Sequence, residues 1–180
     1  ESSSTPLSEE HFASVWSQTD FDGIRRIHLQ IVSNDQQLSF PNNPPALSLD
    51  NHSENAVICR GPDGGAYVAW GERRGDDQWG IMLQRLDSEG SPEWQAGGIE
   101  VAEVADDHTP GYTVYLSSDG SCFIRIGNIV YAYDQSGEAM EGWPLRNIEI
   151  SELIPDDEGG FWFRHENGTY YRASSNGRYV

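Results

Sequence analysis

Short apolar stretches separated by polar turns run along the chain, and they are clearest between residues 56 and 104. The segment AVICRGPDGGAYVAWG (56–71) holds two such stretches. The turn predicted between them is Pro62-Asp63-Gly64-Gly65, because proline fixes φ and glycine tolerates positive φ. IMLQRL (81–86) predicts a third strand and GGIEVAEV (97–104) a short fourth one. Four consecutive strands joined by turns predict an antiparallel meander.

The same pattern returns elsewhere in the chain. A shift of 54 positions places Trp70 on Trp16 and IMLQRL on IHLQIV (27–32) without a gap. YTVYLSSDGSCFIRIG (112–127) lies over residues 56–71 at an offset of 56. The spacing is close to the roughly 40–50 residue period of propeller blades. We therefore predict one domain at 11–180, preceded by a linker or frayed N-terminus at 1–10, with repeat units at 11–50, 51–104, 105–151 and 152–180.

The units are expected to contain three, four, four and three strands. In the first unit the opening strand is the one expected to be missing, and PALSL (45–49) is expected to form its fourth strand. In the second unit ERRGDDQWG (72–80) is expected to be a polar connection between strands. Several strands are apolar on both faces, which indicates a sheet that is covered on both sides.

The fold class predicted is all-β, a propeller-like array of four-stranded antiparallel blades. The strand count gives about three and a half blades, so a partial or shared propeller is favoured over a closed one. Tryptophan side chains are expected to fill the gaps between stacked sheets. The terminal strands at 12–16 and 169–174 are expected to be joined by a partner or by each other.

Composition narrows the range of partners. The formal net charge is −18, and all 11 basic residues are arginine. Such a charge repels phosphate groups, so neither nucleic acid nor anionic membrane is an expected partner. Membrane insertion is not expected, because no apolar run approaches the length of about 20 residues that a spanning helix needs. Adaptation to high salt stays open as an alternative explanation of the acidic surface.

The second unit resembles a propeller-type repeat of large secreted and surface proteins of bacteria. The pattern is GG-x-x-V-x-W, then I-x-x-Q-R-L-D-x-x-G, then W and G-x-x-V. The residues that carry it are Gly64, Gly65, Val68, Trp70, Ile81, Gln84, Arg85, Leu86, Asp87, Gly90, Trp94, Gly98 and Val101. The resemblance is good in the second unit, partial in the first and weak in the last two. It implies a β-propeller in an extracellular or cell-surface setting, and it implies no single activity.

One group of residues is a candidate ligand site. Trp79 lies in the polar segment RGDDQWG with Arg73, Arg74 and Asp77. An exposed tryptophan can stack on a sugar ring, and tryptophan with arginine is typical of protein-binding hot spots. The alternative is that Trp79 caps its own blade.

No catalytic, metal or cofactor site is predicted. The acidic loop residues, Asp20 and Asp22 among them, do not have the spacing of a calcium loop and are expected to be solvated carboxylates. Cys59 and Cys122 each lie in a predicted strand, which favours two buried thiols over a single bridge between repeats.

The function predicted is a non-catalytic binding or assembly module of a secreted or cell-surface bacterial protein. It would act in protein–protein interaction or adhesion, with self-association through open blade edges as one form. The alternatives are a carbohydrate-binding module and a propeller-type glycoside hydrolase or lyase.

Overall fold

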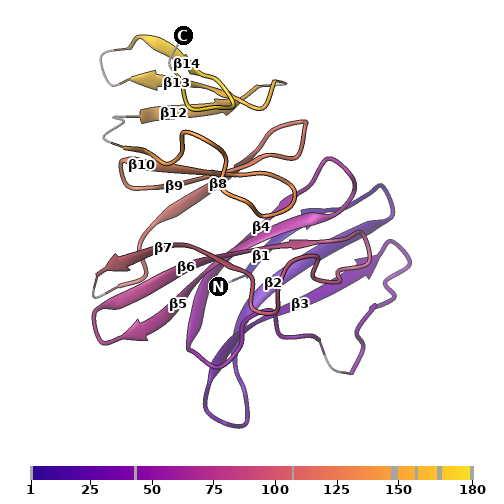
Figure 1. Ribbon diagram of the computed structural model, residues 1–180. Coiled ribbons are helices and arrows are strands. Elements are labelled where there is room, and N and C mark those ends of the chain that lie inside the picture. Colours follow the sequence, from indigo (N-terminus) through magenta and orange to yellow (C-terminus); the bar gives the residue numbers. More distant parts are fainter. Residues whose placement is uncertain are drawn as a thin grey trace. The chain divides into compact units, whose positions relative to one another are not determined.

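The computed structural model describes residues 2–42, 44–106, 108–146, 150–156, 158–165 and 168–178 (Figure 1). These residues form fourteen β-strands and no helix, which confirms the all-β prediction. In the described part of the chain no helix is long and apolar enough to cross a membrane. The chain divides into two compact units, 1–110 and 111–180, where the sequence predicted a single domain. Each unit is described by itself below.

The first unit holds two antiparallel sheets in which every strand pairs with its neighbours in sequence. Sheet I consists of β1 (Ser2–Pro6), β2 (His11–Thr19) and β3 (Arg25–Ser33). Sheet II consists of β4 (Ser53–Arg60), β5 (Ala66–Gly75), β6 (Gln78–Leu86) and β7 (Ile99–Ala105). β4 lies against the strands of sheet I, so the two sheets stack face to face.

The second unit repeats this arrangement with shorter strands. Sheet III consists of β8 (Tyr112–Leu116), β9 (Cys122–Ile126), β10 (Ile129–Tyr133) and β11 (Leu145–Arg146). Sheet IV consists of β12 (Ile150–Pro155), β13 (Phe161–His165) and β14 (Tyr170–Ala173). The meander order within each sheet is that of a propeller blade, and the described residues do not show a closed ring.

One hairpin turn recurs throughout both units, which explains the repeated Asp-Gly signal. After β6 the Asp87 N–H donates to the Ser91 carbonyl over 3.0 Å, and Gly90 has a φ of 86°. The Asp87 carboxylate accepts from the N–H groups of Glu89 and Ser91. This is the three-residue loop that ends in a left-handed residue. The same closing bond spans four positions from Asp20, Ser33, Gly61, Ser117, Asp134, Asp156 and Ser174.

Aromatic side chains fill the seam between the sheets of each unit, as the sequence predicted for tryptophan. In the first unit Trp70 is fully buried in a cluster that includes Val15 and Leu29 of sheet I. In the second unit Trp143 contacts Phe123 of β9 and Phe161 of β13, with each pair of ring centroids 5.3 Å apart.

Four predictions about local structure are wrong. The N-terminal segment is no linker, because Ser2–Pro6 forms β1 and pairs in register with Phe12–Trp16. Sheet I therefore has its first strand, and its fourth is reduced to a single bridge between His28 and Ala46. The polar segment 72–80 is mostly strand, since β5 runs to Gly75 and β6 begins at Gln78.

Candidate binding surfaces

Trp79, the central residue of the predicted site, does not lie open to solvent. Trp79 is in β6, directly opposite Arg73 of β5, and only 6% of its surface is exposed. The prediction of an exposed aromatic residue is therefore wrong, and the side chain packs within its own sheet region. Its indole Nε1 is buried with no hydrogen-bond partner among the described residues.

The other three predicted residues contact nearby protein groups, Arg73 and Arg74 through their side chains and Asp77 through its backbone carbonyl. Arg73 donates from Nε to the Gly75 carbonyl over 3.0 Å and lies 3.7 Å from the Asp76 carboxylate. Arg74 bridges the carboxylates of Glu72 and Glu100. The Asp77 carbonyl accepts the Asp106 N–H over 3.1 Å. The four residues are neighbours on the β5–β6 hairpin, where Arg73, Arg74 and Asp77 are exposed and Trp79 is buried.

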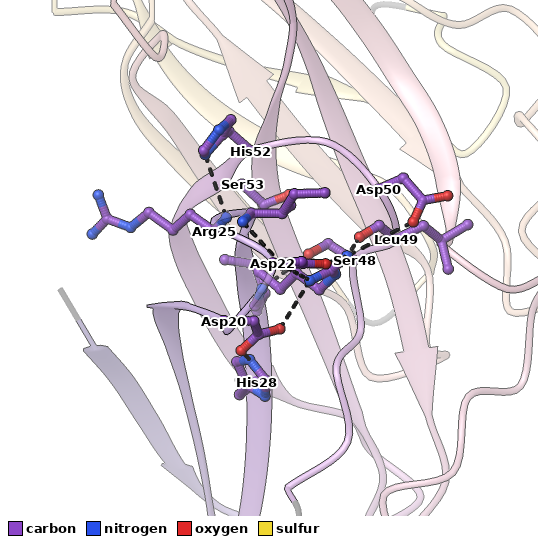
Figure 2. Close-up of polar contacts among 12 residues, drawn as sticks. Asp20, Asp22, Arg25, His28, Ser48, Leu49, Asp50, His52 and Ser53 are labelled. Atoms are coloured by element: carbon purple, nitrogen blue, oxygen red, sulfur yellow. Dashed lines mark hydrogen bonds and ion pairs between the residues drawn. The ribbon is translucent and has the colours of Figure 1, made fainter.

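A polar cluster that the sequence did not predict lies at the β2–β3 hairpin (Figure 2). The Arg26 guanidinium binds both oxygens of Asp22 at 2.8 and 3.0 Å and one oxygen of Asp20 at 3.0 Å. Its Nε donates to the Leu49 carbonyl over 2.6 Å. Asp20 and Asp22 were expected to be solvated loop carboxylates, and they are instead partners of one arginine. The sequence signal is an aspartate four positions before an arginine, with a hairpin turn at Gly23 between them.

His28 connects this cluster to the segment after sheet I. Its Nε2 lies 3.0 Å from the Asp20 carboxylate, and its Nδ1 lies 3.2 Å from the Pro44 carbonyl. Both partners are acceptors, so only the doubly protonated ring can donate to both. Trp16 stacks on the imidazole with centroids 5.9 Å apart.

A pocket opens beside the polar cluster. Its volume is about 670 Å³, and it is lined by Gln18, Asp20, Phe21, Asp22, Arg26, His28, Asn42, Pro44, Pro45 and Ala46. Phe21 at the tip of the hairpin is fully exposed. Nothing in this lining forms a nucleophile–base pair, and the described residues include no group of three or more metal-ligating side chains.

Acid is expected to weaken this hairpin. Hydrogen bonds from Arg26, followed by the Ile24 N–H, lower the pKa of Asp22 to about 2, and burial opposes this only in part. The unfolded chain has an aspartate pKa of about 3.9, so the native state favours the ionised form. The contribution is therefore fully present above pH 4 and is lost as the pH falls through about 2. We expect Asp22→Asn to flatten this part of the pH profile of urea stability, while an unchanged profile would contradict the assignment.

Cys59 and Cys122 are present as thiols. Cys122 is fully buried, and burial raises the pKa of the Cys59 thiol. A thiol with a raised pKa is a poor nucleophile at neutral pH, so neither cysteine suggests catalysis.

Two rows of cross-strand neighbours can be compared between the four sheets. The first row lies beside the turn that joins the first and second strands of each sheet. Its residue on the second strand is Phe12 in sheet I, Ala66 in sheet II, Cys122 in sheet III and Phe161 in sheet IV. The second row is one residue further from that turn. Its residue on the second strand is Ala13, Tyr67, Phe123 and Trp162 in sheets I to IV, respectively. Successive strand residues point to opposite faces, so the two rows lie on opposite faces of each sheet.

The second-strand residues of these rows are buried, with one exception in sheet I and one in sheet IV. The first-row residue is buried in sheets II, III and IV, but Phe12 of sheet I is 47% exposed. The second-row residue is buried in sheets I, II and III, but Trp162 of sheet IV is 44% exposed. Leu38 extends the row of Phe12, and Ile154 that of Trp162, with 45% and 47% exposed. Sheets I and IV therefore each expose an apolar row at the hairpin end of one face, whereas His28 and Gln30, further along that face of sheet I, are buried.

Comparison with known proteins supports the fold only. No model of a known protein family matches the chain, and no curated protein matches it. Among solved structures, residues 644–1017 of HIRA, which has a β-propeller-like fold, match with a TM-score of 0.55 at 10% identity. The match covers 99% of this chain and 52% of that one, so the chain spans about half the length of this neighbour. A Bacteroides caccae protein of unknown function matches with a TM-score of 0.35 at 13% identity, covering 99% of this chain and 79% of that one. The chain is thus an all-β protein whose sheets resemble those of a propeller.

Proposed function

We propose that this chain is a non-catalytic assembly module that binds protein through the exposed apolar rows of sheets I and IV. The observation that carries the proposal is the exposure of Phe12 and Trp162 at places that the other sheets bury. Large exposed apolar surfaces on soluble proteins mark interaction sites more often than isolated apolar residues do.

The chemistry of the described residues supports binding in preference to catalysis. The charged side chains around the pocket at the β2–β3 hairpin are paired with one another, as Arg26 and Asp22 are. The carbohydrate-binding alternative depended on an exposed Trp79, which is buried. An extracellular or cell-surface location belongs to the proposal, and its support is the repeat pattern of the second unit described above.

Self-association is the direct test. At about 0.15 M salt, where charge repulsion is screened beyond about 8 Å, we expect the wild-type chain to sediment above its monomer mass of 20.1 kDa. Trp162→Glu should restore the monomer, because an interface that buried the new carboxylate would leave it unpaired. Thr113→Glu, an exposed strand change outside both rows, is the matched control and should associate like the wild type. A wild-type chain that stays monomeric at all concentrations would contradict the proposal.

A further inference from the structure

We infer that copies of this chain associate head to tail, with the outer face of sheet IV of one copy packed on the outer face of sheet I of the next. The inference rests on the proposed assembly function and specifies its partner and its symmetry. The outer face of sheet I is the face that carries Phe12 and Leu38, and the outer face of sheet IV is the face that carries Ile154 and Trp162.

Both seams inside the chain pair a second row with a first row. In the first unit Ala13 and Ile31 of the second row of sheet I share a buried cluster with Ala66 and Leu86 of the first row of sheet II. The second unit shows the same relation, because the second row of sheet III and the first row of sheet IV share a cluster. The residues concerned are Phe123, Ala132, Phe161 and Ala173.

The two uncovered rows are the two halves of one more seam of this kind. Sheet IV offers an exposed second row, and sheet I offers an exposed first row. Two copies placed together in the internal relation therefore match row to row. Pairing two identical faces would instead bring together two second rows or two first rows, a combination that occurs in neither internal seam.

The charged residues of the two sheets are already paired within the chain. On sheet IV Arg172 lies opposite Trp162 in register and binds the carboxylates of Asp156 and Glu158. At the β2–β3 hairpin of sheet I, Arg26 binds Asp20 and Asp22. The contact between copies therefore rests on the exposed apolar rows, and not on a match of opposite charges.

Such a contact uses two different surfaces and is therefore heterologous. A heterologous contact gives a closed ring when its rotation closes, and an open chain otherwise. The head-to-tail contact also makes a specific prediction: a copy with one of these two faces blocked can still bind another copy through its other face.

A complementation experiment with two blocked variants tests this. Phe12→Glu blocks sheet I and Trp162→Glu blocks sheet IV, and each variant alone should sediment as a monomer. An equimolar mixture should give a dimer of twice 20.1 kDa and nothing larger, because one intact sheet IV meets one intact sheet I. Its dissociation constant should lie within about threefold of the wild-type contact, and each single variant should associate at least about 100-fold more weakly, since a buried unpaired charge costs several kcal/mol.

The alternatives give different results. If identical faces pair through sheet IV, Phe12→Glu associates by itself and mixing adds nothing, which overturns the head-to-tail arrangement and leaves the assembly function standing. If the wild-type chain does not associate, both proposals fail. Leu38→Glu and Ile154→Glu form a second pair at the same two faces, and they repeat the test should either first variant fold poorly.

Discussion

Phe161→Ala is expected to lower the free energy of unfolding of the second unit by about 3–5 kcal/mol. Phe161 is fully buried in the seam between sheets III and IV, and removing a buried phenylalanine costs both the lost burial and the cavity that remains. Its ring lies 5.3–5.7 Å from those of Trp143, Phe123 and Phe163. Aromatic pairs in these tilted arrangements each add about 0.5–1.5 kcal/mol beyond their burial.

The adjacent residue provides a matched control for this prediction. Trp162 is the next residue of β13 and points to the opposite, uncovered face. Measured at a concentration where the chain is monomeric, Trp162→Ala should cost less than about 1 kcal/mol. Urea dependence of amide hydrogen exchange in β9 and β13 measures both effects. Equal losses for the two variants would contradict the assignment of Phe161 to the inner seam and Trp162 to the outer face.

The repeated meander could be predicted from sequence because its determinants are local. Apolar runs define the strands, and Asp-Gly pairs define the turns between them. The match between IHLQIV and IMLQRL also has a structural cause. The side chain of Gln30 bonds to the N–H and the carbonyl of Phe40, and Gln84 bonds in the same way to the Trp94 N–H and the Gln95 carbonyl. Each glutamine fixes the segment that follows the third strand of its sheet.

Strand β1 could not be predicted, because the segment SSSTP contains no apolar pattern. It becomes a strand through partners distant in the sequence. Its backbone pairs with β2, and the Ser3 hydroxyl accepts the Ile58 N–H over 3.3 Å. Strand formation depends strongly on such surroundings, so a polar edge strand carries little signal of its own.

The candidate site around Trp79 was misplaced for a related reason. A run of charged residues is typical of a loop, but strands that extend beyond the core can be polar on both faces. β5 and β6 continue to the two-residue turn Asp76-Asp77. Trp79 therefore lies within β6, opposite Arg73 of β5, and its side chain is buried. The exposure of the rows in sheets I and IV could not be predicted from the sequence either, because apolar residues in a strand are typical of the core. Phe12 and Trp162 differ from their counterparts in the other sheets in being exposed.

Gly65→Ala is expected to destabilise the first unit by about 3 kcal/mol, more than Gly64→Ala does. A Cβ on Gly65 would lie 2.2 Å from the Leu86 carbonyl oxygen, so β5 and β6 would have to separate, and such overpacking costs about 1–3 kcal/mol or more. Gly64 has a φ of 86° with no atom within 4 Å of an added Cβ, so its replacement costs only backbone strain of about 1–2 kcal/mol. Gly160 of sheet IV repeats the first situation, with its Cβ site 2.3 Å from the Ala173 carbonyl oxygen. Urea denaturation of the two single variants gives the order of the losses. A larger loss for Gly64→Ala would mean that the turn conformation, and not the close approach of β6, requires the glycine pair.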